Sequence, residues 1–159
     1  MAVKVFISHK LEDAGLAKLI SDRLQNIHSI GTYLDLLDPT IGRNGEELAQ
    51  YVRKKLASCT QLLAVISPLT KDSWWVPWEI GVASEKDYPL ATYGGTATLP
   101  DFLKRWPVLR NEQHLDAYAR ASKGADSNRV LLERTVTASA ARKSTTQDFY
   151  RSLRNQIGQ

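Results

Sequence analysis

Apolar residues follow two alternating patterns along this chain: short continuous runs, and longer stretches with a spacing of three to four residues. The short runs contain β-branched and aromatic residues and are bounded by turn residues, which is typical of buried strands. They cover residues 3–7, 32–35, 61–67, 88–93 and 106–109. Pro89 places the fourth run at a strand start or at a sheet edge, because proline cannot donate to a ladder.

Between these runs the apolar spacing predicts amphipathic helices. The expected stripes are Leu16, Ile20, Leu24 and Ile27 in the first helix, Leu48, Val52 and Leu56 in the second, and Phe149, Leu153 and Ile157 in the last. A Trp-rich helix begins at about residue 75, and a short helix with Leu115 and Tyr118 follows the fifth run. We expect the polar segment 121–129 to be a loop and residues 144–147 to cap the last helix. That helix is expected to pack on its own domain, and packing on a partner is the alternative.

Alternation of strands and helices predicts an α/β fold with an open, mainly parallel sheet and helices on both faces. The chain of 159 residues is expected to form a single domain, with a core over about 3–120 and a C-terminal extension over about 121–159 that ends in an amphipathic helix. A hydrophobic content of 43% with 24% charged residues is ordinary for a globular protein. The single Cys59 excludes an internal disulfide and favours a cytoplasmic location.

The formal net charge of +4 is mild, and the basic residues are spread along the chain except at Arg53-Lys54-Lys55. That cluster has no interleaved aromatic residues, so it indicates a solvated helix face rather than a nucleic-acid site. No apolar run is long enough to cross a bilayer. We therefore expect neither nucleic acid nor membrane as a partner, although the positive charge would attract an anionic ligand.

The candidate site is the segment 73–79, which follows the third apolar run. If a helix begins at about residue 75, Trp75 and Glu79 lie one turn apart on one face. A carboxylate beside an indole, at the carboxyl end of a parallel strand, is where an open α/β sheet usually holds its ligand. The alternatives are a solvated helix glutamate and a tryptophan of the core. Because Trp74, Trp75 and Trp78 cannot all point inward from one helix, at least one is expected to be exposed at an assembly surface.

Further candidates follow the first two strands. Ser8, His9 and Lys10 would line the cleft above the first strand, with Lys10 near a phosphate; the alternative for His9 and Lys10 is an exposed loop. Asp35 either binds a ribose hydroxyl or braces the next loop. The loop from Asp38 onward contains glycines whose backbone freedom suits a lid. The scattered histidines form no metal set, and neither a dinucleotide-binding glycine motif nor a Ser-His-Asp order is present.

Several of these segments occur in the order of motifs found in one family. They are Val5–His9 for a first box, Tyr33–Asp35 for a second strand, Asp38–Glu46 for the BB loop, Cys59–Ser67 for a third strand, and Ser73–Glu79 for the motif Ser-x-Trp-Cys-x-x-Glu. Over residues 3–93 the chain thus resembles a TIR (Toll/interleukin-1 receptor) domain, which implies a flavodoxin-like fold. Val76 stands at the Cys position, which is not catalytic in the family. From Gly94 onward the chain is more similar to elaborated bacterial relatives than to animal receptor domains.

The resemblance implies an activity. Many bacterial and plant TIR domains cleave NAD at the nicotinamide–ribose bond, and the family's catalytic glutamate and neighbouring tryptophan match Glu79 and Trp75. The substrate-binding positions that it implies are Ser8, His9, Lys10, Asp35, Asp38, Arg43 and Trp75. NAD would be a substrate and not a cofactor, and no metal is expected. The product would be ADP-ribose, a cyclic isomer or an ADP-ribosyl conjugate.

Similarity to bacterial single-domain proteins, such as those of the Thoeris system, implies a role in anti-phage defence, with a nucleotide signal that reaches a separate effector. Family members commonly self-associate to complete a site. Two other functions stay open. One is a non-catalytic module that acts by homotypic assembly, and the other is an enzyme similar to nucleoside deoxyribosyltransferases, which also use a glutamate on ribose. Nicotinamide release and a test of free nucleosides would separate the three.

Overall fold

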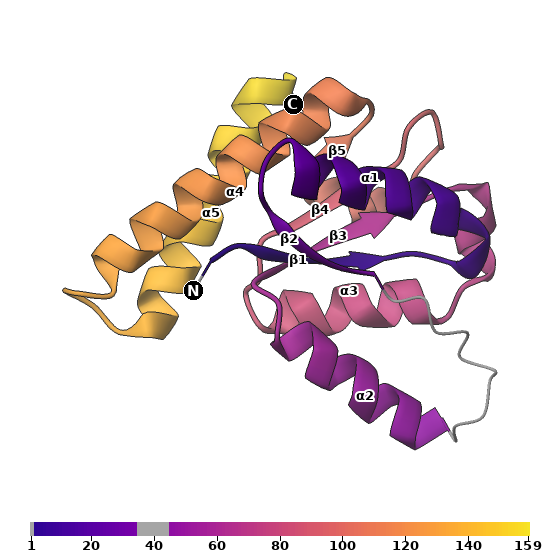
Figure 1. The fold of residues 1–159 in the computed structure, drawn as a ribbon, viewed down its shortest axis with the longest axis horizontal. Helices are drawn as coiled ribbons and strands as arrows, with labels where there is room; N and C mark the ends of the chain where they lie inside the picture. Colours follow the sequence, from indigo (N-terminus) through magenta and orange to yellow (C-terminus); the bar gives the residue numbers. More distant parts are fainter. Residues whose placement is uncertain (1, 35–44) are drawn as a thin grey trace.

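Five parallel strands form the centre of the protein in a computed structural model that describes residues 2–34 and 45–159 (Figure 1). The strands are β1 (Lys4–Ser8), β2 (Gly31–Leu34), β3 (Gln61–Val65), β4 (Leu90–Tyr93) and β5 (Val108–Leu109). Their order in the sheet is β2-β1-β3-β4-β5, and every pairing is parallel. All five predicted strands are therefore present. The chain leaves β1 to one side for β2 and returns to the other side for β3, so the switch point of the sheet lies between β1 and β3.

Helices cover both faces of the sheet, as predicted. The α-helices are α1 (Ala14–Asn26), α2 (Gly45–Ala57), α3 (Trp75–Glu85), α4 (Glu112–Leu132) and α5 (Ala138–Ile157), and the short 3-10 helices are η1 (Leu11–Asp13), η2 (Pro68–Asp72) and η3 (Asp101–Arg105). In Figure 1, α2 and α3 lie below the sheet and α1 lies above it. The antiparallel pair α4 and α5 shares the face of α1 and extends past the sheet at the left of the figure.

Side chains from alternate positions of each strand enter two separate cores. Val5 and Ile7 pack with α1, α4 and α5, whereas Phe6 packs with α2 and α3. This division follows from the period of two along a strand, which sends successive side chains to opposite faces. Residues 61–65 of β3 are all buried because helices cover both faces of the central strands.

The buried stripe of α1 differs from the predicted one. Ile20 and Leu24 are buried as expected, but Leu16 is 37% exposed and Ile27 is 61% exposed. The helix instead buries the small side chain of Ala17 beside Ile20 and Leu24. The prediction was wrong at both ends of the stripe because Ile27 follows the last helical residue, and because a small residue lets the helix approach the sheet closely.

Residues 121–129 are not a loop, as the polar sequence suggested, but the second half of α4. Packing against α5 explains the difference, because an antiparallel helix pair needs only a narrow stripe of small residues between its members. Ala121 and Ser122 are buried, and the Ser122 hydroxyl accepts a hydrogen bond from Gln61 of β3 at 2.7 Å. Arg129 also pairs with Asp126 three residues earlier at 2.7 Å and with Glu133 four residues later at 2.7 Å, and such spacings support a helix.

The last helix also begins earlier than predicted. Thr137 caps α5 by accepting a hydrogen bond from the Ala140 backbone N–H at 3.2 Å, so residues 144–147 lie inside the helix and do not cap it. Thr146 is buried there and donates to the Asp87 carbonyl oxygen at 2.9 Å. Phe149 and Leu153 are buried in the core shared with α1, which confirms that the helix packs on its own domain.

Candidate functional site

The candidate site centres on a carboxylate buried at the carboxyl edge of the sheet. Glu79 lies in the second turn of α3 and is only 2% exposed. Its Oε2 accepts a hydrogen bond from the Ser8 hydroxyl, which is itself fully buried at the end of β1. Two residues 71 positions apart in the sequence thus meet beside the switch point.

The alternating side-chain directions along β1 and the helical period of α3 explain why Ser8 and Glu79 lie in contact. Ser8 follows Phe6 by two positions, so both side chains face α3. On α3, Val76, Ile80 and Glu79 share the buried side, since positions three and four apart are neighbours on a helix. The alternative of a solvated Glu79 is therefore excluded, because Glu79 lies on the buried side of the helix with Val76 and Ile80.

Three tryptophans surround the start of α3, and the structure separates them. Trp75 is half-buried and packs edge to face with Trp78, with 5.4 Å between ring centroids and an interplanar angle of 88°. Both rings pack against the core of α2 and α3. Trp74 points outward and is 92% exposed, which confirms that the three cannot all face inward. Trp75 therefore lies one turn before Glu79, and its ring is held in place by the contact with Trp78.

His9 is buried rather than part of an exposed loop. Its Nδ1 lies 3.1 Å from the Ile7 carbonyl oxygen. Because a carbonyl only accepts, this contact needs a proton on Nδ1, and in that tautomer Nε2 is an acceptor. Within the part of the chain that the structure describes, nothing hydrogen-bonds to the buried Nε2. Such an orphaned acceptor beside Ser8 suits a ligand hydroxyl or amide.

Lys10 is partly buried next to His9, and its ammonium group lies 3.5 Å from Glu12 Oε1. An anionic ligand would compete with this partly exposed ion pair, which contributes little by itself. The structure therefore brings Ser8, His9 and Lys10 together along one edge with Glu79 and Trp75. Asp35, Asp38 and Arg43, together with the expected lid, lie outside the described residues.

Sequence reasoning missed one link across the edge. The buried Asp13 accepts a hydrogen bond from the Ser67 hydroxyl at 2.8 Å, which joins the start of α1 to the end of β3. Ser67 also caps η2 by accepting from the Leu69 backbone N–H at 3.1 Å. The Ser67-Pro68 pair carried the signal of a helix N-terminus, but the partner on α1 was not visible in the sequence.

A groove of about 620 Å³ lies beside α3, and Ser8 and Glu79 are not part of its lining. Its lining is mostly apolar and comes from the end of β3, η2, the first turns of α3, and the segment before η3. Val76 and Ile80 of α3 are shared between this groove and the core next to Glu79. The exposed side chains Leu69, at 45%, and Phe102, at 60%, lie in the same region of the surface.

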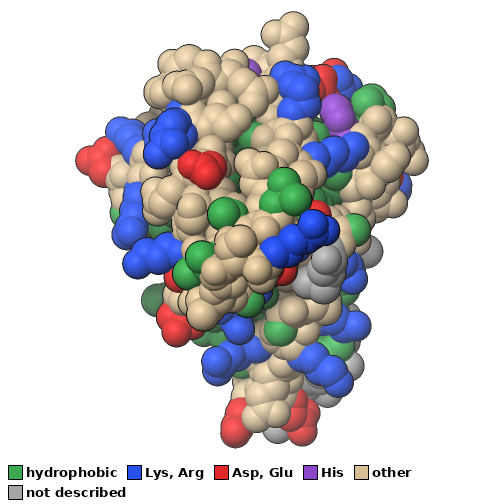
Figure 2. All heavy atoms as spheres, turned by 90° about the vertical axis from the view of Figure 1, so that its left-hand side faces the viewer, with side chains coloured by type: hydrophobic (Ala, Val, Ile, Leu, Met, Phe, Trp, Pro, Cys, Tyr) green, Lys and Arg blue, Asp and Glu red, His purple; other side chains and the backbone are tan. Residues whose placement is uncertain are grey.

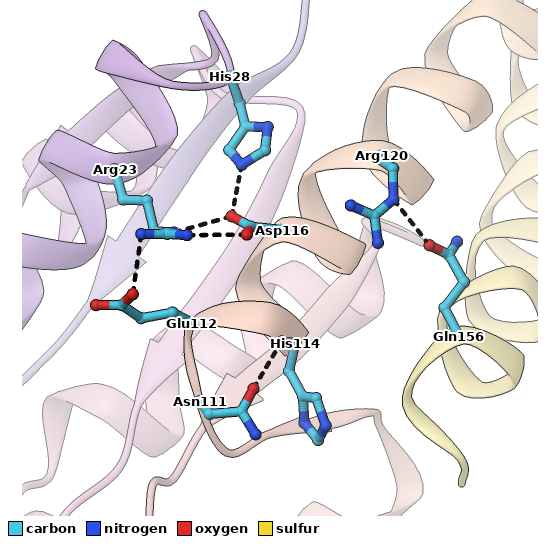
Figure 3. A network of polar contacts seen from close by, with 8 residues as sticks. All are labelled: Arg23, His28, Asn111, Glu112, His114, Asp116, Arg120 and Gln156. Carbon is cyan, nitrogen blue, oxygen red and sulfur yellow. Dashed lines mark hydrogen bonds and ion pairs between the residues drawn. The ribbon is translucent and has the colours of Figure 1, made fainter.

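A second polar cluster joins α1 to α4 on the opposite face of the sheet (Figure 3). Arg23 donates twice to Asp116, at 2.8 and 2.9 Å, and once to Glu112 at 3.0 Å, while His28 Nε2 lies 2.7 Å from the same Asp116. The hydrogen bonds from Arg23 and then from His28 hold the pKa of the Asp116 carboxyl well below its usual range. Every charged group here has a partner, so this cluster braces two helices.

No three histidine, cysteine, aspartate or glutamate side chains gather at metal-ligand spacing within residues 2–34 and 45–159. Over the same residues, no helix has the length and apolar character needed to span a bilayer.

Comparison with known proteins agrees with the fold. The family model described as TIR domain matches residues 5–132, which is most of the chain and extends well beyond the motifs recognised over 3–93. A search of curated proteins finds no matching sequence.

Proposed function

Since the chain belongs to the TIR domain family, we propose that it is an enzyme that cleaves NAD at the nicotinamide–ribose bond with Glu79 as its catalytic residue. The observation that carries the proposal is the buried Glu79 carboxylate, hydrogen-bonded to Ser8 at the carboxyl edge of the sheet. A buried carboxylate is costly to a fold unless it is paired, and such groups cluster at functional sites.

The chemistry of NAD needs one negative charge at the correct place. Nicotinamide departs as a neutral base from a pyridinium, so no acid has to protonate it, and positive charge develops on the ribose ring. The Glu79 carboxylate would stabilise this oxocarbenium-like state, and its effect is strong because the surroundings exclude water. The bond from Ser8 holds the carboxylate in one orientation before the substrate arrives.

The neighbouring side chains suggest how the rest of the substrate lies. Trp75 would form a wall against the ribose or the nicotinamide ring, supported by its edge-to-face contact with Trp78. His9 Nε2 would accept a hydrogen bond from a ribose hydroxyl or the carboxamide, and Lys10 would exchange Glu12 for a phosphate. We include Asp35, Asp38 and Arg43 in the proposed site only on the family resemblance. The bond cleavage needs water or a second hydroxyl as acceptor and no added cofactor.

Mass spectrometry of products from concentrated protein and NAD tests the proposal. We expect release of nicotinamide, and the mass of the other product distinguishes hydrolysis, cyclisation and conjugation. Glu79→Gln keeps the shape and removes the charge, so turnover should fall at least a hundredfold. Glu85→Gln is the matched control, because Glu85 is an exposed carboxylate on the same helix and its loss should change nothing. Equal turnover in both variants would contradict the proposal, and cleavage of free nucleosides alone would favour the deoxyribosyltransferase-like alternative.

A second candidate is assembly through contacts between copies, either in support of catalysis or as the whole function. Trp74, at 92% exposure, favours it, because a large exposed aromatic side chain is unusual for a surface without a partner; Trp74 directly follows Ser73, which lines the apolar groove. Sedimentation of wild type and Trp74→Ala over a range of concentrations tests it. Turnover of NAD that rises faster than protein concentration, and that Trp74→Ala loses, would join the two functions.

We further propose that the product serves as an immune signal in anti-phage defence and acts on a separate effector in the cytoplasm. This proposal rests on the resemblance to small bacterial TIR proteins. Survival of cells under phage infection, compared between wild type and Glu79→Gln, would test it.

A further inference from the structure

The α4–α5 hairpin ends in a protruding tip of unusual composition. Three aliphatic side chains of this tip are exposed: Val130 at 41%, Leu131 at 58% and Val136 at 45%. They lie at the end of α4 and in the connection to α5, beyond the edge of the sheet (Figure 1). Figure 2 looks toward the end of the molecule on which the hairpin lies, and shows hydrophobic side chains among many Lys and Arg side chains. The sequence analysis did not predict this exposed helical tip, because the polar segment 121–129 was expected to be a loop.

Positive charge is concentrated on the same part of the chain. Residues 123–143 contain five of the 21 Lys and Arg residues but only two of the 17 Asp and Glu residues, so the rest of the chain, with 16 and 15, is almost neutral. Both acids of the segment, Asp126 and Glu133, are held by Arg129. Among the described residues no carboxylate pairs with the exposed side chains of Lys123, Arg134 and Lys143. Arg142 is also exposed and lies over the Tyr88 ring at 5.5 Å.

The expectation that no membrane is a partner rested on the absence of a bilayer-spanning run, which does not address peripheral contact. We propose that this tip, residues 123–143, docks on an anionic membrane surface. Such a surface has two layers, the boundary of the acyl chains and the anionic head groups. Exposed aliphatic side chains can contact the first, and the lysine and arginine side chains around them can contact the second. Leu131 and its two aliphatic neighbours enter the interface, while Arg134 and Lys143 reach the phosphates. The contact is peripheral and reversible, because three partly exposed aliphatic side chains and a few basic groups give only modest affinity.

The shape of the tip favours a bilayer over the other anionic partners. A stable protein interface needs about 800 Å² per partner with complementary shape. The hollow lined by Ala125, Asp126, Arg129 and Arg142 encloses only about 90 Å³, and the three exposed aliphatic side chains lie outside it. Single-stranded nucleic acid needs aromatic platforms for stacking, and 123–143 contains no aromatic residue. A fluid surface needs no complementary shape, so a convex aliphatic point suffices.

Flotation of the full chain with vesicles tests the proposal, independently of any activity on NAD. We expect flotation with vesicles of phosphatidylcholine mixed with phosphatidylglycerol, none with phosphatidylcholine alone, and weaker binding at high salt. Leu131→Ser should weaken binding about tenfold by removing apolar contact. Arg134→Gln with Lys143→Gln should weaken it on the order of tenfold by removing two charges. Circular dichroism checks that each variant is folded.

Two matched controls lie on other faces. Leu69→Ser removes an aliphatic group of similar exposure, and Lys54→Gln with Lys71→Gln removes the same charge; both should bind vesicles like wild type. Absence of flotation with anionic vesicles would overturn the proposal. So would flotation that the tip variants leave unchanged, or binding of the tip to a DNA duplex without binding to vesicles.

Discussion

The bond between Ser8 and Glu79 leads to the sharpest prediction about stability. Ser8→Ala removes one hydroxyl group from a fully buried position and leaves no cavity of consequence. The carboxylate of Glu79 then loses a donor inside the domain, where water cannot replace it. Hydrogen bonds to charged groups contribute about 1.5–3 kcal/mol, so the free energy of unfolding should fall by about 2 kcal/mol. For a chain of this length that corresponds to a loss of roughly 4–8 °C in melting temperature.

Urea unfolding followed by circular dichroism measures this change at neutral pH. Ser144→Ala is the matched control, since Ser144 is exposed within α5 and its loss should change stability by less than about 0.5 kcal/mol. A double-mutant cycle with Glu79→Gln isolates the pair, and we expect a coupling energy above about 1 kcal/mol. Wild-type stability in Ser8→Ala would refute the reasoning, because it would mean that the buried carboxylate does not depend on this donor. In the same variant, turnover of NAD should fall, since Glu79 loses its fixed orientation.

Three further variants test other parts of the fold. Asp116→Asn should lower the free energy of unfolding at neutral pH by about 1 kcal/mol, a value kept small because the ion pair is partly exposed. Because the pKa of Asp116 is depressed in the folded protein, its carboxylate stabilises the fold above the unfolded pKa and loses this contribution as the pH falls. In the variant, the free energy of unfolding should therefore depend less on pH below about pH 4. Urea titrations at several pH values measure this, and an unchanged acid limb would contradict it. Tyr118→Phe should cost about 1 kcal/mol in a urea titration, because its buried hydroxyl accepts from Gln61 at 2.6 Å. Phe149→Ala should cost about 3–5 kcal/mol by opening a cavity between α4 and α5, and a smaller loss in a thermal melt would indicate that the hairpin closes over it.

The spacing of apolar residues and the turn residues between the runs made most of the sheet and its helices predictable. The runs of β1 and β3 contain consecutive apolar residues over 5–7 and 62–65, and such continuous runs are typical of strands in a parallel sheet covered on both faces. The start of α3 at Trp75 agrees with the prediction that the Trp-rich segment after the third run forms a helix from about residue 75. These features depend on residues close in sequence.

The second half of α4 was not predictable in this way. Its residues are polar and small, and they are helical because α5, which follows later in the chain, covers them. The same reason explains why the true start of α5 at Thr137 was missed. Local preference is weak in such segments, and tertiary packing decides between helix and loop.

At the candidate site, the sequence alone identified the side chains Ser8, Trp75 and Glu79 near the ends of predicted elements. It also showed that the segments that contain them occur in the order of the family's motifs. Only the tertiary structure decided that Glu79 is buried, that its donor is Ser8, and that Trp74 faces solvent while Trp75 does not. It also decided that Asp13 bonds to Ser67 across the edge, and that the basic and aliphatic residues of 123–143 share one protruding tip. The physical reason is that spacing along the chain specifies the face of an element, whereas partners and burial depend on how distant elements pack together.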